Sequence, residues 1–184
     1  MCIRDRYSLR KNSIKIILPG RVSFWKGHAI AIEAMSYLKE KINKDFELVF
    51  VGPINNDKLK ENLLNKINEF KLQDNIKFVG PSKKMNLIYS VADIVLSCST
   101  DPEAFGRIPV EAQSMGKIII ASNIGGSNET IINDRTGFLF EAGNAVSLSK
   151  KIIRAITMDE TSLKLMGKEG RKNVIKKKIC HFIQ

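Results

Sequence analysis

The sequence predicts an α/β fold, a Rossmann-like doubly wound parallel sheet of about six strands. Short apolar, β-rich runs alternate regularly with amphipathic helical segments, and the connections between them are short. Strands and helices that alternate in this way form parallel pairs through right-handed crossovers, with helices on both faces of the sheet. The 184 residues, 43% of them hydrophobic, suffice for one such domain with a sizeable core.

The first half of the chain begins this alternation with the apolar run at 14–18, which predicts a buried strand. Residues 26–39 follow with apolar side chains at helical spacing, and the helix at 57–71 repeats the pattern with Leu59, Leu63 and Ile67 on one face. The elements expected here are strands at 14–18, 46–51 and 76–79 and helices at 26–39, 57–71 and 83–91.

The second half continues the alternation. Pro109 fits only near the start of a helix, where its missing N–H is not needed, so the helix at 107–115 should begin at Arg107 or Ile108. The elements expected here are strands at 93–97 and 118–121, helices at 107–115 and 144–156, and further elements at 128–132 and 137–140.

Two carboxylates flank a predicted strand-to-helix junction in residues 99–116, where Glu103 lies in the loop and Glu111 in the helix. Open α/β sheets bind ligands where a strand ends and a helix begins, and a helix N-terminus offers unpaired N–H groups to a phosphate. Gly106 lets the backbone approach a ligand closely, and carboxylates suit ribose or sugar hydroxyls. The sequence therefore predicts a nucleotide-sugar site. The N–H groups expected to face the phosphates or the sugar belong to Phe105, Gly106, Arg107 and Ile108.

Glu103 and Glu111, with seven residues between them, resemble the signature of retaining glycosyltransferases of family 4 (GT4). Two other blocks resemble the same family in the same order, and the resemblance covers about residues 13–172. It implies a GT-B enzyme, of which this chain is the C-terminal, donor-binding half. The residues of the two further blocks are Gly20, Arg21, Lys26 and Gly27 upstream and Gly125, Gly126, Glu129 and Gly137 downstream.

The resemblance implies catalytic roles for Arg21, Lys26 and Glu103. Arg21 and Lys26 would hold the donor diphosphate and stabilise its developing charge, and Glu103 would accept hydrogen bonds from the transferred sugar. Covalent catalysis by Glu103 is the alternative mechanism, and it would need a second carboxyl about 5 Å away. For Arg21 and Lys26 the alternative to a role in the site is a solvated surface loop.

The resemblance also implies binding residues. Glu111 would accept hydrogen bonds from the ribose, or it would only stabilise the first turns of its helix. Gly20 would lie beside the donor, and Gly80, Pro81 and Ser82 are candidates for the place where the base stacks. The turn at Gly125 and Gly126 has two open roles, a tight loop without ligand contact or a sugar-facing turn.

No metal site is predicted, because the sequence has no aspartate-x-aspartate motif and no clustered histidines and carboxylates. The expected donor is a nucleoside-diphosphate sugar, and no other cofactor is expected. The three cysteines lie too far apart for a metal pattern or an obvious disulfide, and Cys98 should be a packed, inert thiol. A reducing cytoplasm suits this cysteine usage.

The net charge of +11 is concentrated at the two ends of the chain. Residues 1–15 hold five basic side chains and one acidic side chain, and residues 164–184 hold seven basic and one acidic. The 148 residues between them hold 18 basic and 17 acidic side chains. The core therefore does not resemble a nucleic-acid-binding surface. A basic tail suits either plain solvation or peripheral contact with anionic lipids at the inner face of a membrane. The sequence has no apolar run of membrane-spanning length and no signal peptide.

The expected organisation is a non-native or disordered leader at 1–12, a nucleotide-sugar-binding domain at 13–172 and a basic, truncated tail at 173–184. The predicted function is retaining transfer of a hexose to a glycan or lipid-linked acceptor, in cell-envelope polysaccharide or lipopolysaccharide assembly. We expect the fragment to be inactive without the missing N-terminal GT-B domain. The alternatives are a nucleotide-sugar binding module without turnover and, less in keeping with the residues present, a nucleotide-sugar epimerase.

Overall fold

The computed structural model describes residues 7–176, and its centre is a parallel sheet of six strands in the order β3-β2-β1-β4-β5-β6. Each pair of neighbouring strands in this sheet is parallel, and consecutive strands are joined by helical crossovers. The predicted fold class is therefore confirmed. The strands are β1 (Ile14–Pro19), β2 (Phe46–Val51), β3 (Ile76–Phe78), β4 (Ile94–Ser97), β5 (Ile118–Ser122) and β6 (Phe138–Phe140).

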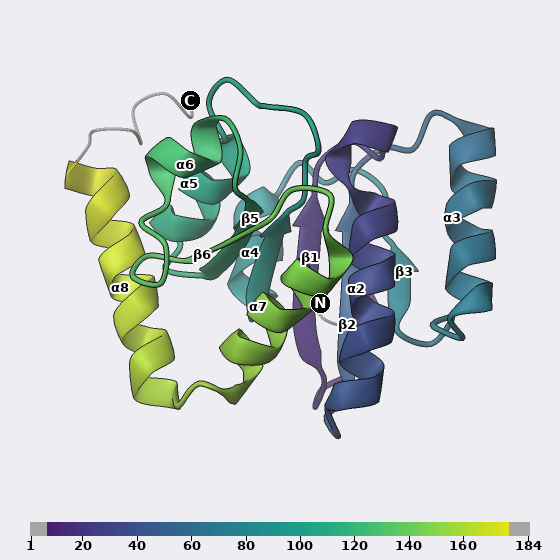
Figure 1. The fold of residues 1–184 in the computed structure, drawn as a ribbon, viewed down its shortest axis with the longest axis horizontal. Coiled ribbons are helices and arrows are strands. Elements are labelled where there is room, and N and C mark those ends of the chain that lie inside the picture. Colours follow the sequence, from purple (N-terminus) through teal and green to yellow (C-terminus); the bar gives the residue numbers. More distant parts are fainter. Residues whose placement is uncertain (1–6, 177–184) are drawn as a thin grey trace.

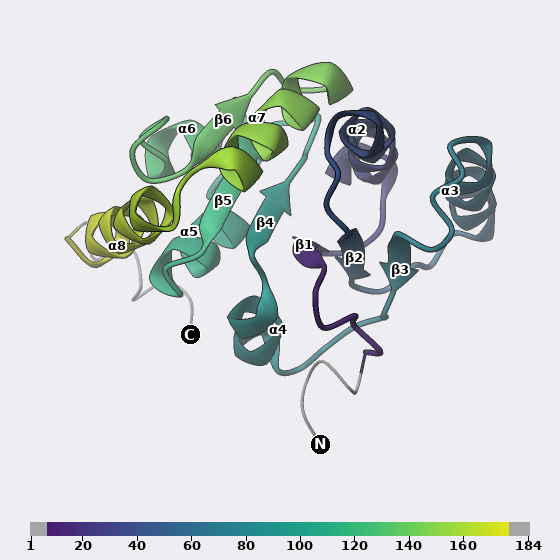
Figure 2. The same ribbon diagram turned by 90° about the horizontal axis from the view of Figure 1, so that it is seen from below.

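Helices cover both faces of the sheet (Figure 1). Helices α2, α3 and α7 lie on one face and α4 on the other, as the view in Figure 2 shows, while α8 packs against α5. The helical elements are η1 (Phe24–Lys26), α2 (His28–Lys41), α3 (Asp57–Glu69), α4 (Met85–Val91), α5 (Arg107–Ser114), α6 (Gly126–Thr130), α7 (Ala145–Thr157) and α8 (Glu160–Lys176).

The strand side chains divide between two cores because successive residues point to opposite faces. Ile16 and Leu18 of β1 join the core that contains Met35 of α2, whereas Ile17 joins the core that contains Ile88 of α4. Each fully buried aliphatic side chain contributes about 1.5–3 kcal/mol of transfer free energy. Burial on both faces accounts for the nearly continuous apolar runs in these strands.

The helix predicted at 26–39 is divided in the structure. Residues 24–26 form η1, and α2 begins only at His28, after Gly27 with φ 70°. A Cβ on Gly27 would lie 1.9 Å from the carbonyl oxygen of Cys98, so only glycine fits between these loops. Cys98 is a buried free cysteine whose pKa is raised by desolvation, as expected for a packed thiol.

Two further differences lie in the second half. The element expected at 128–132 is the short helix α6, which begins two residues earlier, at Gly126. Helix α8 is not among the elements expected from the sequence. Gly167 of α8 approaches the turn that follows α5 closely, since a Cβ there would lie 2.3 Å from the carbonyl oxygen of Gly116. The glycine lets a polar, lysine-rich helix pack tightly despite its few apolar residues.

Residues 7–12 belong to the range expected as a leader, but they pack against the sheet. Leu9 is buried with Ile17 and Val49, and the backbone N–H of Arg10 donates to Glu47 Oε2 over 2.8 Å. Structure therefore begins before residue 13, while residues 1–6 and most of the basic tail at 173–184 lie outside the described residues. Within 7–176, no helix combines the length and the apolar character that a membrane crossing requires.

Candidate functional site

The sheet order reverses beside β1, since β2 and β3 follow on one side and β4 to β6 on the other. The loops that leave β1 and β4 thus separate at the carboxyl edge of the sheet, where open α/β sheets form their ligand crevice. A cleft of about 370 Å³ lies there. Nine of the residues proposed from the sequence line it, namely Gly20, Arg21, Lys26, Pro81, Ser82, Glu103, Arg107, Ile108 and Glu111.

The loop after β1 is held by backbone contacts to the loop after β2. Gly20 has φ 118° and its N–H donates to the carbonyl of Val51 over 2.9 Å. A Cβ on Gly52 would lie 2.0 Å from the carbonyl oxygen of Gly20. This close approach fixes where the loop starts, and Arg21 follows it as an exposed side chain on the cleft wall.

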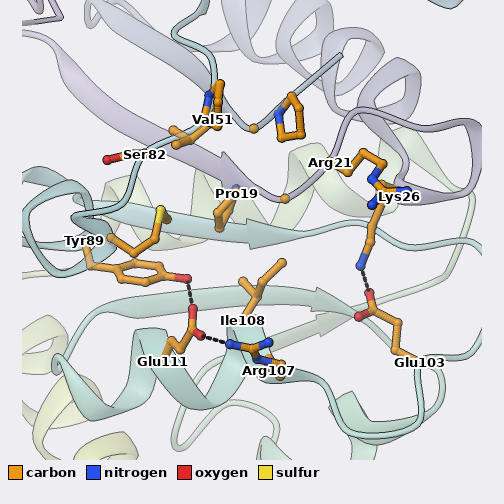
Figure 3. A pocket seen from close by; sticks show the side chains of 15 residues that line it. Pro19, Arg21, Lys26, Val51, Ser82, Tyr89, Glu103, Arg107, Ile108 and Glu111 are labelled. Atoms are coloured by element: carbon orange, nitrogen blue, oxygen red, sulfur yellow. Dashed lines mark hydrogen bonds and ion pairs between the residues drawn. The ribbon is translucent and has the colours of Figure 1, made fainter. Parts of the chain in front are cut away.

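Lys26 is held by Trp25 and Glu103. Its ammonium lies 4.2 Å from the centroid of the Trp25 ring, a cation–π contact, and 2.8 Å from Glu103 Oε1 (Figure 3). The hydroxyl of Ser99 donates to the same carboxylate oxygen. The pair joins the loop after β1 to the loop after β4, and both side chains stay partly exposed, 14% for Lys26 and 24% for Glu103.

The loop that carries Glu103 rests on the turn at Gly125 and Gly126. The N–H of Gly126 donates to the carbonyl of Glu103 over 2.8 Å, and a Cβ on Gly125 would lie 2.6 Å from that oxygen. A Cβ on Gly126 would lie 2.6 Å from the carbonyl carbon of Phe105. The two glycines therefore support the loop from behind, which favours the structural role among the two left open by the sequence.

Helix α5 begins at Arg107, as Pro109 predicted. Gly106 precedes it with φ 62°, a left-handed conformation that lets the chain turn from the loop into the helix. Arg107 and Ile108 line the cleft, so the first turn of α5, with its unpaired N–H groups, lies at the wall. Gly106 itself is buried, and Phe105 is an exposed side chain outside the lining.

Glu111 lies one turn into α5 and accepts a hydrogen bond of 2.6 Å from the hydroxyl of Tyr89. Arg107 Nη2 lies 3.6 Å from its other oxygen, and Figure 3 shows the three side chains in a row. Burial and the neighbouring carboxylate raise the pKa of Tyr89, so the phenol stays protonated and donates. Sequence reasoning missed Tyr89; its place next to the apolar Ile88 in the helix expected at 83–91 is the signal that could have found it.

The base candidates lie at the other side of the same cleft. Pro81 and Ser82 line it, whereas Gly80 does not. Gly80 has φ 70° and open space where a Cβ would be, so it turns the chain that presents Pro81 and Ser82. Met85, at the start of α4, adds an apolar side chain to this wall and was not predicted.

A family model described as glycosyl transferases group 1 matches residues 3–173. The chain belongs to this family. The GT-B relationship inferred from the three sequence blocks is thereby confirmed, and solved glycosyltransferases share the fold.

Three similar proteins, two longer chains and one isolated domain, show where this glycosyltransferase domain lies among its relatives. Lipopolysaccharide 1,2-N-acetylglucosaminetransferase of Salmonella typhimurium is 28% identical over 86% of this chain and 43% of its own length. A glycosyltransferase from Rickettsia africae is 36% identical with a TM-score of 0.89, over 94% of this chain and 45% of that one. The C-terminal domain of a group 1 glycosyl transferase from Francisella tularensis is 25% identical with a TM-score of 0.82, over 95% and 92%. The chain spans less than half the length of the curated relatives it matches.

His28 of this group 1 domain lies behind the cleft loop and is not a lining residue. Its ring packs edge-on against Phe50 at 4.9 Å between centroids, and burial lowers its pKa to about 4, so it is neutral near pH 7. Residues 7–176 contain no group of three or more histidine, cysteine or acidic side chains that could hold a metal ion. Metal independence stays a prediction.

Proposed function

We propose that this domain binds the nucleoside-diphosphate sugar donor of a glycosyltransferase that transfers a hexose to a glycan or lipid-linked acceptor with retention of anomeric configuration. One observation carries the proposal: cations of the loop after β1 and carboxylates of the loop after β4 and of helix α5 line one cleft at the reversal of the sheet order. Membership of the group 1 family and similarity to a lipopolysaccharide N-acetylglucosaminetransferase support it.

Arg21 and Lys26 are proposed to bind the diphosphate. Cleavage of the bond to the anomeric carbon leaves negative charge on the phosphate, and fixed cations stabilise that charge most as it develops. Lys26 is placed for this task by Trp25 and Glu103, whereas Arg21 is exposed and free to approach a ligand from the rim. Both residues would act as electrophilic catalysts.

The two carboxylates are proposed to bind hydroxyls. Glu111, in the first turns of α5, would accept hydrogen bonds from the ribose hydroxyls. Glu103, beside Lys26, would accept hydrogen bonds from hydroxyls of the transferred sugar. In this mechanism the acceptor attacks from the face that the phosphate leaves, and the departing phosphate takes the acceptor proton. The pairing of Glu103 with Lys26 supports a binding carboxylate next to the diphosphate site, and a covalent role for Glu103 is the alternative.

The wider setting is also proposed. The reaction would occur in the cytoplasm, at or near the inner face of a membrane, and without a metal ion. An N-terminal GT-B domain would bind the acceptor. A second function, nucleotide-sugar binding without turnover, is favoured for the 184 residues by themselves, because the chain spans less than half the length of its curated relatives.

Calorimetric titration tests the donor site. The chain is titrated with UDP, GDP and ADP and with their common sugar conjugates, in EDTA, beside Glu111→Ala and the exposed control Glu61→Ala. We expect one nucleotide to bind, with affinity at least about tenfold weaker in Glu111→Ala and unchanged in Glu61→Ala. Absence of binding by folded protein, or equal binding by Glu111→Ala, would overturn the proposal.

A further inference from the structure

Tyr89 combines a buried ring with a hydroxyl at the cleft. The residue is 2% exposed, its ring belongs to the core beneath α4 and α5, and it lines the cleft together with Glu111. A ring packed in a core keeps one rotamer, because neighbouring side chains fill the space around it. The phenol oxygen is therefore a fixed point beside a carboxylate that is itself only partly buried, with 21% of its side chain exposed.

The two neighbours of Glu111 hold it very differently. The Tyr89 hydroxyl is 2.6 Å from Oε2, a short charge-assisted hydrogen bond. Arg107 is 3.6 Å from Oε1 and its side chain is 69% exposed, which is typical of a loose surface ion pair. Orientation of the carboxylate thus depends on Tyr89, while Glu111 lines the cleft with part of its side chain exposed.

We infer that Tyr89 is a positioning residue, which orients Glu111 so that the carboxylate accepts both hydroxyls of a ribose and discriminates against deoxyribose. This inference rests on the proposed function. A carboxylate has about four lone-pair sites, and the phenol occupies one, so enough remain for the two donors of a vicinal diol. A fixed carboxylate rejects a ligand that lacks one of those hydroxyls, because a site built for a hydrogen bond then keeps an unpaired polar group.

Tyr89→Phe removes the hydroxyl and keeps the ring. The matched control is Tyr37→Phe, because Tyr37 is a partly buried tyrosine of α2 on the opposite core. The probes are UDP, GDP and ADP, their 2′-deoxy counterparts and inorganic pyrophosphate. For the nucleotide that binds, we expect the ribose form to bind about tenfold more weakly to Tyr89→Phe, with less than about twofold change for the 2′-deoxy form.

Affinity for pyrophosphate should be equal in wild type, Tyr89→Phe and Tyr37→Phe. A Tyr89→Phe variant that keeps the wild-type ratio between ribose and deoxyribose forms would overturn the inference and leave the donor site intact. Failure of every nucleotide to bind the wild type would overturn the proposed function together with the inference. The ratio separates positioning from a structural role, because general loosening of the cleft weakens all probes alike.

Carbon-13 NMR of tyrosine labelled at Cζ tests the same point without altering Tyr89. The chain has three tyrosines, so Tyr7→Phe and Tyr37→Phe assign the signals by elimination. Addition of the ribose nucleotide should move the Tyr89 signal, and the 2′-deoxy form should move it less. Equal movement with both nucleotides, or none, would contradict the inference even if Tyr89→Phe does not fold.

Discussion

Among the lysine–glutamate ion pairs of residues 7–176, those at Glu47 and at Glu103 differ in how completely the carboxylate is enclosed. On the face of the sheet under residues 7–12, Glu47 is 0% exposed and lies 2.7 Å from Lys77 Nζ and 3.7 Å from Lys15 Nζ. At the carboxyl edge, Glu103 is 24% exposed and pairs with Lys26. We call the first group, formed by Arg10, Ser13, Lys15, Glu47 and Lys77, the Glu47 cluster.

The Glu47 cluster is closed. Its carboxylate also accepts from the Ser13 hydroxyl and from the backbone N–H of Arg10, both over 2.8 Å, so a ligand has no access to it. Buried charge is tolerated in proteins only when it is paired and hydrogen-bonded. The pair of Lys26 and Glu103, by contrast, keeps both groups at the cleft wall. Enclosure therefore separates a cluster that supports the fold from a pair that can exchange its partner for a ligand.

The largest effect should follow from opening the closed cluster. Glu47→Ala leaves the buried Lys15 and its neighbour Lys77 without their carboxylate, and loss of one partner of a buried pair costs about 3–5 kcal/mol. Urea unfolding followed by circular dichroism measures it. Glu40→Ala, at an exposed position of α2, should change the free energy of unfolding by less than about 0.5 kcal/mol. Equal stability of the two variants would contradict the distinction.

The closed cluster should also dominate acid sensitivity. Burial by itself raises the pKa of Glu47, but the contacts with Lys77, Ser13 and the Arg10 N–H outweigh it and the pKa is lowered. A carboxyl whose folded pKa is below its unfolded pKa of about 4.3 adds stability above that value and loses it as pH falls toward the folded pKa. The free energy difference between wild type and Glu47→Gln should therefore be constant near neutral pH and shrink with acid. A difference independent of pH would show that Glu47 contributes through packing only.

The features that could be predicted from the sequence are those that depend on residues close together along the chain. Apolar runs gave the strands, and Pro109 placed the start of α5 at Arg107. The order of the strands then brought Lys26 and Glu103, which follow the neighbouring strands β1 and β4, to one cleft, as general rules for parallel sheets require.

Contacts between distant segments were not predictable in this way. The division at Gly27 depends on the approach of Cys98, and the hydroxyl of Tyr89 reaches Glu111 only after α4 and α5 have packed. The Glu47 cluster likewise joins residues 13 and 77, which no local pattern connects. Charged residues inside apolar strands, Lys15, Glu47 and Lys77, are the signal that could have indicated it.

The smallest change in stability should come from the open pair, and it should be accompanied by a change in binding. Lys26→Ala removes a partly exposed ion pair, so the free energy of unfolding should fall by about 1 kcal/mol or less. Nucleoside-diphosphate affinity should fall at least about tenfold, because a charge-assisted contact to the phosphate is lost. Lys77→Ala is the matched control: it breaks the closed cluster away from the cleft, so it should lower stability more and leave affinity unchanged. Urea unfolding and calorimetry give the loss of stability and the loss of affinity for each of the two variants. The comparison fails if the ratio of these two losses is the same for Lys26→Ala and Lys77→Ala.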